Sequence, residues 1–406
     1  MDTFATNKSI NLKIAGSVFL KKGKSVSIAR RHPWVFSGAI QRMQGPIADG
    51  SWVEVRDEKG DILGIGHYQH GSIAVRILSF GPTRPTEAFW ETAISKALHQ
   101  RLSISLIDEK TNCYRLIHGE GDGLPGLIID FYDGVAVIQA HSIGMHLDRH
   151  NISAALEGVF GRDLKAVYYK SHSTLPGRAT DDESVGYLKG MIGVPHVVLE
   201  NSCKFFVDWE EGQKTGFFLD QRDNRALLGK YVAGKNVLNT FCYTGGFSIY
   251  AIAGNATVVH SVDASERAIE AARKNIALNQ FDEHLHKCFA SDTFDFMKDR
   301  ANEYDVIVLD PPAFAKHRDA RHQAVKGYQR LNMDAMRIIR PGGIIFTFSC
   351  SQVVDKKLFY DTIVSASINA GRQIKVLHQL SQAPDHPVSI FHPEGEYLKG
   401  LVLYVE

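Results

Sequence analysis

Five short apolar runs decide the fold: NVLNTFCYTGG (236–246), VVHSVDAS (258–265), CFASDTF (288–294), YDVIVLDPPAF (304–314) and IIFTFSCS (344–351). Four of them end in an acid or a glycine turn, and the fifth ends in Ser-Cys-Ser. Helical patterns separate the runs, which is typical of a parallel sheet with crossover helices. Ligands bind such sheets at the carboxyl ends of the strands. The sequence therefore predicts an α/β domain with its functional site along that edge.

The turn after the first run and the acids after the next two predict a cofactor site. Gly245 lets the backbone approach a ligand. Asp263 can bind both hydroxyls of a ribose, while Asp292 and Thr293 could read an adenine edge. A nicotinamide dinucleotide would also suit Asp263, but the loop lacks the GxGxxG pattern that holds a pyrophosphate. We therefore expect S-adenosylmethionine, and the alternative is that these acids only cap helices.

The motif Asp310-Pro-Pro-Ala-Phe314 predicts contact with a planar base. Its two prolines, Pro311 and Pro312, fix a rigid turn with few backbone donors of its own. Asp310 can hydrogen-bond an amine or a ring nitrogen, and Phe314 can stack on the base. Taken alone, the motif favours methyl transfer to a nitrogen.

Cys350, within Ser349-Cys-Ser351, favours transfer to carbon instead. Carbon 5 of cytosine is a poor nucleophile until a thiolate adds to C6 and makes C5 enamine-like. Cysteine suits this role because it is strongly nucleophilic even when only a few per cent is thiolate. A lone cysteine at the end of a strand is more often a packing residue. We expect a catalytic role because Cys350 falls at the same edge as Asp310.

A basic module precedes the α/β region. Residues 13–80 read as short strands separated by Gly-rich turns, which predicts a small β-barrel or sandwich. Residues 1–80 hold 11 Lys and Arg against 6 Asp and Glu, although the whole chain has a net charge of only +1. Arg30 and Arg31 could contact phosphates while Trp34 stacks on unpaired bases. The alternative is a solvated basic surface with Trp34 and Phe36 in the core.

The remaining patterns divide the chain into three expected domains: 1–81, 86–185 and 186–406. Gly81–Pro85 is a credible linker, and the middle domain mixes helices and strands. The GxGxxG match at 121–126 is predicted to be a hairpin turn, because strand-like sequence rather than a helix follows it. Residues 197–219 are predicted to form a hairpin that leads into a helix, and residues 373–380 and 397–405 should pair as antiparallel strands. Helices are expected at 87–107, 146–159, 246–253, 265–279, 292–301, 327–340 (stopped by Pro341-Gly-Gly343) and 355–371.

Composition narrows the class of protein further. Hydrophobic residues make up 44% and charged residues 22%, as in ordinary globular proteins. The first residues, MDTFATNKSINLK, are polar, and no apolar run is long enough to span a membrane. The five cysteines lie far apart and form no CxxC pair, so neither a disulfide scaffold nor a metal site is expected. We expect a reduced, cytoplasmic protein.

Taken together, the motifs resemble the RlmI family, bacterial enzymes that form 5-methylcytosine in 23S ribosomal RNA. The resemblance runs through nearly the whole chain and rests on RRHPWVFSGAI (30–40), RLIHGEGDGLPGLIIDFY (115–132), KTGFFLDQRDNR (214–225), VLNTFCYTGGFSIYA (237–251), LDPPAFAK (309–316), TFSCS (347–351) and HPEGEYLKGLVL (392–403). It implies an N-terminal PUA RNA-binding domain, a central α+β domain and a C-terminal class I, Rossmann-like methyltransferase domain. It also implies 23S RNA or an assembling large subunit as the partner, and relatives of this kind often form homodimers.

The resemblance assigns roles to particular residues. Cys350 would be the nucleophile, and Asp310 would hold the cytosine edge and also bind the cofactor. Pro312 and Phe314 would contact the base. The cofactor site would be lined by Phe241, Tyr243, Gly245, Asp263, Asp292 and Thr293, and closed by Phe217, Asp220 and Arg222. Many RNA cytosine-5 enzymes carry a second cysteine in the DPPAF region, where this chain has Ala313 and Phe314. The group that removes the C5 proton therefore stays open, and Cys242 is expected to be structural.

Two other functions fit parts of the pattern. The DPP-F signature also occurs in ribosomal RNA enzymes that methylate a guanine nitrogen (N2 or N7), a reaction that needs no thiolate. A catalytically silent RNA-binding assembly factor with a methyltransferase fold is the alternative outside enzymes. The silent assembly factor is disfavoured because the chain retains the expected cofactor and catalytic residues Asp263, Asp292, Asp310 and Cys350.

Overall fold

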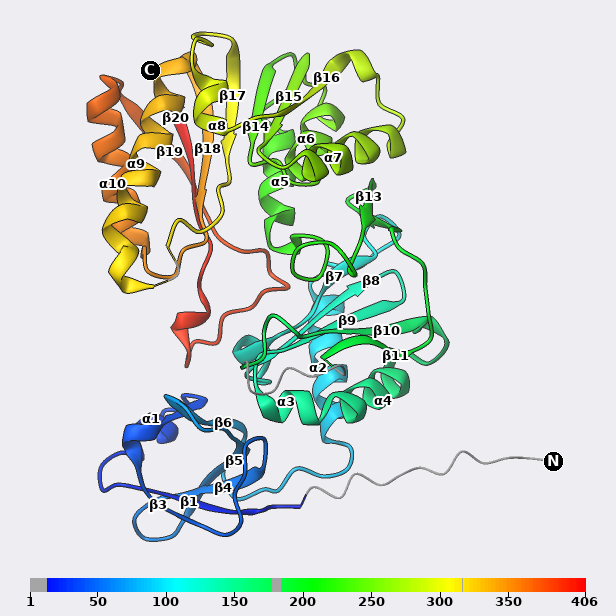
Figure 1. The fold of residues 1–406 in the computed structure, drawn as a ribbon, viewed down its shortest axis with the longest axis vertical. Coiled ribbons are helices and arrows are strands. Elements are labelled where there is room, and N and C mark those ends of the chain that lie inside the picture. Colours follow the sequence, from blue (N-terminus) through cyan, green and yellow to red (C-terminus); the bar gives the residue numbers. More distant parts are fainter. Residues whose placement is uncertain (1–12, 177–183, 316) are drawn as a thin grey trace, which may run out of the picture. The chain divides into compact units, whose positions relative to one another are not determined.

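The computed structural model describes residues 13–176, 184–315 and 317–406 (Figure 1). The polar start of the chain and Lys316 of the LDPPAFAK motif lie outside the described residues. Contacts divide the chain into two compact units. The first comprises Met1–His196, Val207–Gly216 and Asp385–Gly395, and the second Val197–Phe206, Phe217–Pro384 and Glu396–Glu406. No helix among the described residues is long and apolar enough to cross a membrane.

The first unit begins with a six-stranded sheet of order β2-β6-β5-β4-β1-β3, which confirms the strands expected in residues 13–80. Neighbouring strands are antiparallel except β1 and β4, which run parallel. Val18, Val53 and Val75 are among the apolar side chains that fill its core. The elements are β1 (Gly16–Leu20), α1 (Val26–Ala29), β2 (Trp34–Phe36), β3 (Ile40–Gln44), β4 (Trp52–Arg56), β5 (Ile62–Tyr68) and β6 (Ile73–Phe80).

A five-stranded sheet of order β11-β10-β9-β8-β7 completes the first unit. The GxGxxG match joins β7 to β8, which pair antiparallel, so the predicted hairpin turn is confirmed. Within that turn Asp122 accepts two hydrogen bonds from Arg101, of 2.5 and 2.8 Å. The elements are α2 (Phe89–Ser103), β7 (Cys113–His118), β8 (Leu127–Tyr132), β9 (Val135–Ala140), α3 (Ile143–Leu147), α4 (Arg149–Phe160), β10 (Ala166–Lys170) and β11 (Val185–Lys189).

The second unit is built on a seven-stranded sheet of order β16-β15-β14-β17-β18-β20-β19 (Figure 1). The first five strands in that order are parallel, and β20 runs antiparallel to both of its neighbours. The predicted antiparallel pairing of the last two strands is therefore confirmed. The strands are β14 (Asn236–Thr240), β15 (Val258–Asp263), β16 (His286–Ala290), β17 (Tyr304–Leu309), β18 (Ile339–Ser349), β19 (Ile374–Leu380) and β20 (Lys399–Val405).

Helices α6 to α10 connect these strands, and α5 precedes β14. Among the described residues these helices pack in two groups. Helices α5 to α7 form one group, and α8 to α10 form the other. A hairpin of β12 (His196–Glu200) and β13 (Cys203–Val207) precedes them, as the sequence predicted. The helices are α5 (Arg222–Gly229), α6 (Gly246–Ala253), α7 (Glu266–Leu278), α8 (Thr293–Met297), α9 (Arg321–Ile338) and α10 (Lys356–Ala370).

The strand order reverses at β14, and this reversal sets the place of the site. From β14 the chain proceeds outward through β15 and β16, then returns to the other side of β14 with β17 and β18. Thr240 at the end of β14 is level with Val262 on one side and with Leu309 on the other. Such a switch point leaves a crevice beyond the carboxyl ends of the strands. The turns that follow β14, β15, β17 and β18 meet at this edge.

Three helix predictions needed correction. Helix α9 ends at Ile338 because Ile339 is already extended, so Pro341-Gly-Gly343 lies inside β18 and does not stop the helix. The helix expected at 292–301 ends at Met297, and Lys298 is extended. The helix expected at 146–159 is two helices divided at Asp148. In α2 the buried side chains are Trp90, Ile94, Ala97 and Arg101, while Phe89, Ala93 and Leu98 are partly buried against the same core.

Candidate active site

The turn between β14 and α6 has an unusual backbone. Phe241, Tyr243 and Gly245 have φ angles of 52°, 47° and 81°. Left-handed conformations cost about 1–3 kcal/mol for residues other than glycine and cluster at ligand sites. A Cβ at Gly245 would lie 3.1 Å from the Cβ of Ala272, so the turn also packs closely against α7. The sequence placed the cofactor turn at Gly245 but gave no sign of the conformations of the two aromatic residues.

Asp263 at the end of β15 is linked to this turn by its carboxylate. Oδ2 accepts a hydrogen bond from the backbone N–H of Tyr243 (3.0 Å), and Oδ1 accepts one from Ser265 (2.9 Å). Each carboxylate oxygen can accept more than one bond, so both retain capacity for a ligand hydroxyl. The half-buried carboxylate therefore lies beside the β14 turn, as the cofactor prediction requires.

Asp292 and Thr293 lie next along the same edge. Asp292 caps α8, because its Oδ1 accepts from the backbone N–H groups of Phe294 (2.8 Å) and Asp295 (3.1 Å). The capping role left open by the sequence is thus present at Asp292, whose side chain is also exposed. Thr293 is buried. The N–H of Ser291 donates to the carbonyl of Asp263 (3.0 Å), which ties the ends of β15 and β16 together.

The three residues expected to close the site from before β14 have different surroundings. Phe217 is buried against Phe205, with ring centroids 4.8 Å apart, and Arg222 is buried beside Glu200 at 3.6 Å. Both side chains therefore pack in the region of the β12–β13 hairpin. Asp220 is half-buried and lies near Asp310.

Asp220 has one carboxylate oxygen available for a ligand. Its Oδ2 accepts a hydrogen bond of 2.6 Å from the hydroxyl of Tyr397. Its Oδ1 is buried and has no hydrogen-bond partner among the described residues. An unsatisfied buried acceptor costs about 1–3 kcal/mol. A hydroxyl or an amine of a bound cofactor would remove that cost.

Asp310, directly after β17, has a perturbed acidity. Burial first, and then the nearby Asp220, raise the pKa of Asp310 to about 7. A side-chain hydrogen bond from Gln221 and the charge of Arg225 act in the opposite direction. Near neutral pH the carboxyl group is therefore partly protonated and can donate or accept a hydrogen bond.

Cys350 follows β18, the parallel neighbour of β17. Leu309 is level with Thr347, so Asp310 and Cys350 emerge at the same edge of the sheet. Cys350 is half-buried and is not part of the apolar core. Cys242 is buried in the cofactor turn, and burial, followed by the charge of Asp263, raises its pKa well above the usual value. It therefore remains a thiol, in agreement with the structural role expected for it.

The sequence analysis missed Lys399, the first residue of β20. Lys399 is only 5% exposed, and its Nζ donates a hydrogen bond of 2.7 Å to the carbonyl oxygen of Ser351. Burial lowers the pKa of Lys399 to about 8, and the strongest opposing influence is Cys350. The sequence did contain a signal for this residue: Lys399 is the first residue of the otherwise apolar strand KGLVLYV. Lysine is almost never buried without a partner, so a lysine in such a strand indicates a paired charge.

The residues expected to contact the base lie in the loop after β17. Pro312 is exposed, and Phe314 is half-buried. The Phe314 ring packs 4.7 Å from the ring of Tyr328, and a Cβ at Gly327 would come within 3.1 Å of it. One part of the Phe314 ring is therefore covered by α9.

In the first unit, Arg30 and Arg31 are exposed at the end of α1, as a phosphate-binding role requires. Trp34 is only half-buried, but it already has partners within the unit. Its indole N–H donates to Glu120 (2.9 Å), and its ring meets that of His392 edge-on at 4.4 Å. Phe36 is 48% exposed, so the alternative that placed both aromatic residues in the core is wrong for Phe36.

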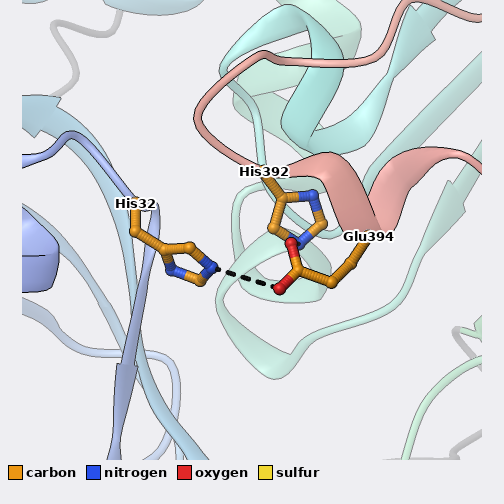
Figure 2. Close-up of side chains that lie close together, drawn as sticks. All are labelled: His32, His392 and Glu394. Atoms are coloured by element: carbon orange, nitrogen blue, oxygen red, sulfur yellow. Dashed lines mark ion pairs between the residues drawn. The ribbon is translucent and has the colours of Figure 1, made fainter.

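Figure 2 shows a cluster of His32, His392 and Glu394 in the same unit. Nε2 of His32 and Nε2 of His392 lie 3.9 and 3.8 Å from the Glu394 carboxylate. Nδ1 of His32 accepts a hydrogen bond from the backbone N–H of Trp34 (3.2 Å). A neutral His32 ring must then carry its proton on Nε2, the atom that faces Glu394, whereas a metal ligand needs that nitrogen bare. The cluster is thus arranged for contact between the histidine rings and the Glu394 carboxylate and does not favour a metal site.

Comparison with known proteins agrees with this geometry. A family described as S-adenosylmethionine-dependent methyltransferase matches residues 114–394, and a PUA-like domain family matches residues 18–80. A ribosomal RNA large subunit methyltransferase I from Pseudoalteromonas atlantica is 38% identical over 397 residues, which cover 97% of this chain and 100% of that protein.

Two solved structures share the fold along nearly the whole chain. One is a proposed SAM-dependent methyltransferase from Streptococcus mutans, with a TM-score of 0.81. The other is a proposed methyltransferase complexed with SAH, with a TM-score of 0.83. Each is 22% identical to this chain, and each match covers 97% of this chain and 100% of the solved chain.

Proposed function

We propose a reaction for this chain, which belongs to the ribosomal RNA large subunit methyltransferase I family: methyl transfer from S-adenosylmethionine to C5 of a cytosine in 23S ribosomal RNA. The observation that carries the proposal is the position of Cys350. Its half-buried thiol follows β18 at the sheet edge where Asp310 follows β17 and the cofactor turn follows β14. Transfer to a nitrogen would give this cysteine no role.

The residues around the β14 turn fit S-adenosylmethionine. The buried Oδ1 of Asp220 lacks a partner among the described residues, and both oxygens of Asp263 can accept further bonds. We expect Asp263 to hold the ribose. The site would be lined by Phe241, Tyr243 and Gly245. Farther along the same sheet edge, it would include Asp292 and Thr293. It would be closed from before β14 by Phe217 and Arg222. The bound cofactor would supply an electrophilic methyl group.

The reaction follows from the two residues at the neighbouring strand ends. The Cys350 thiolate adds to C6 of the cytosine, and the carboxyl group of Asp310 donates its proton to N3 as electron density moves there. C5 is then enamine-like and accepts the methyl group. The C5 proton passes to water as the C6–S bond breaks, which restores the aromatic ring and the thiolate, while N3 returns its proton to Asp310. A pKa of about 7 suits Asp310 to this exchange near neutral pH.

We assign three domains to this activity. Residues 1–81 would bind RNA through Arg30, Arg31 and Trp34, residues 86–185 would form the central domain, and residues 186–406 would carry the reaction. Pro312 and Phe314 would contact the target base. The partner would be 23S RNA or a large-subunit assembly intermediate in the cytoplasm. The enzyme would form a homodimer, which a mass in solution twice that of the chain would support.

Nucleoside mass spectrometry tests the proposal directly. Large-subunit RNA from cells lacking the protein would be incubated with purified enzyme and S-adenosylmethionine, then digested. We expect one new 5-methylcytosine with the wild type and none with Cys350→Ala. A methylated guanine, formed equally by both proteins, would contradict the cytosine assignment. RNA binding without any methylation would favour a silent assembly factor.

A further inference from the structure

Lys399 is the charged group whose position the proposed reaction leaves unexplained. It is level with Ser349 in the antiparallel pair of β18 and β20, so its side chain lies on the face of the sheet that Ser349 shares. From there the ammonium reaches past the end of β18 to the carbonyl of Ser351. The hydrogen bond places the ammonium beside the Ser349-Cys-Ser351 segment.

A buried ammonium needs more than one carbonyl. It has three N–H donors, and among the described residues the hydrogen bond to Ser351 is its only assigned bond. Burying an unpaired charge is costly, so an anion should lie nearby. Three groups favour the ammonium form: Cys350 first, then Asp355 and Glu396.

Two of these three groups have other roles or are exposed to water. Asp355 caps α10 through a hydrogen bond of 2.8 Å from the N–H of Leu358. Glu396 is exposed and pairs with Lys356, whose own charge opposes a second ammonium nearby. Cys350 is the remaining group, and it is the neighbour in sequence of Ser351, whose carbonyl oxygen accepts the hydrogen bond from Lys399. Tyr328 also lies near the thiol, and burial raises its pKa to about 12, so it contributes no charge at neutral pH.

We propose that Lys399 is a positioning residue that keeps Cys350 as a thiolate. The inference rests on the proposed function, in which that thiolate attacks C6. No bond to Lys399 forms or breaks: the ammonium stays protonated and stabilises the negative charge on sulfur before attack and after elimination. A lysine beside a cysteine is one of the arrangements that bring a thiol into its anionic form near neutral pH.

Thiol alkylation tests the inference without relying on methyl transfer. The full chain would be treated with iodoacetamide over a range of pH, and modification of Cys350 would be followed by peptide mass spectrometry. We expect Lys399→Met to slow alkylation at neutral pH by about 10-fold or more and to move its midpoint to higher pH. Lys399→Arg should retain most of the wild-type rate. Lys357→Met, at a lysine that is 85% exposed on α10, is the matched control and should change nothing.

The methyl-transfer assay gives an independent second measurement. Lys399→Met should lose activity at neutral pH and regain part of it as the pH rises, because solvent then ionises the thiol. A merely structural lysine would give a loss that pH does not restore. An unchanged alkylation midpoint in Lys399→Met overturns the inference, even if the proposed function holds. Full activity of Cys350→Ala overturns the proposed function, whatever the alkylation result.

Discussion

The hydroxyl of Ser351 donates a hydrogen bond of 2.7 Å to the carbonyl oxygen of Ala315. This bond joins the segment after β18 to the loop after β17, and so joins the two segments that carry Cys350 and Asp310. Both groups of this bond are buried. A reaction that needs a thiol on one face of a base and a carboxyl group on its edge depends on the spacing of these segments.

Removing this link should impair catalysis more than stability. A hydrogen bond of this kind contributes about 0.5–1.5 kcal/mol, so we expect Ser351→Ala to lower kcat several-fold. The affinity for S-adenosylmethionine should change little, because most of the expected cofactor residues lie in turns that follow other strands. Ser367→Ala, which removes a comparable bond to the carbonyl of Arg372 (2.9 Å), is the control. Unchanged kcat in Ser351→Ala would show that the spacing does not depend on this bond.

Asp310 should make stability depend on pH. Its folded pKa of about 7 is above the usual value of a carboxyl group, so the folded state favours the protonated form. Its stabilising contribution is therefore complete at low pH and is lost as the pH rises toward and through 7. Asp310→Asn should raise the free energy of unfolding by roughly 1 kcal/mol at pH 8, after allowance for partial exposure, but not at pH 4.

Chemical denaturation of wild type and Asp310→Asn at the two pH values measures this difference. The same variant should be nearly inactive, because an amide cannot supply a proton to N3. Equal stabilisation at both pH values would mean that Asp310 is ionised in the folded protein at neutral pH. Asp305→Asn is a suitable control, since Asp305 pairs with Arg340 at the opposite end of β17.

Gly245→Ala should weaken cofactor binding. The φ angle of 81° and the approach of 3.1 Å to Ala272 both oppose a side chain at this position. A cost of about 1–3 kcal/mol in the turn corresponds to a loss of affinity of roughly 10- to 100-fold. Isothermal titration with S-adenosylmethionine checks this, with Gly371→Ala as a control at another left-handed glycine, distant in the chain at the end of α10. Wild-type affinity in Gly245→Ala would place the cofactor elsewhere.

Neutralising the basic end of α1 should weaken RNA binding and its dependence on salt. Each phosphate contact contributes a slope of roughly 0.7–0.9 in the plot of log affinity against log salt. If both arginines contact phosphates, Arg30→Gln/Arg31→Gln should reduce that slope by up to about 2. Fluorescence anisotropy with a 23S RNA fragment at several salt concentrations measures it, with Lys59→Gln as the control on the β4–β5 turn. An unchanged slope would remove the role assigned to these two arginines.

Much of the fold was predictable because its signals are local. The helix at 246–253 was predicted at its observed bounds, and the apolar runs became the five parallel strands. Asp263 was predicted at the strand end from its position after an apolar run, which requires no knowledge of distant residues. The end of α9 was misjudged because Pro341-Gly-Gly343 usually stops a helix, whereas here pairing of β18 with β17 extends the chain from Ile339.

The parts of the site that the sequence did not reveal depend on contacts between distant residues. Lys399 comes next to Ser351 only through the pairing of β18 with β20, across 48 positions of the chain. Trp34 meets Glu120 across 86 positions, so its indole N–H has a protein partner that no local pattern indicates. Phe217 and Arg222 stand in the same motif as Asp220, but their packing against the β12–β13 hairpin becomes visible only in three dimensions.

The most direct test of the central claim uses RNA that contains 5-fluorocytidine. Fluorine at C5 cannot leave as the proton does, so the bond between the enzyme sulfur and C6 should persist after methyl transfer. We expect wild-type enzyme and Cys288→Ala to form a protein–RNA adduct that survives denaturation, carries one transferred methyl group and maps to Cys350. Methylation of the RNA without an adduct, or an adduct formed equally by Cys350→Ala, would contradict the account.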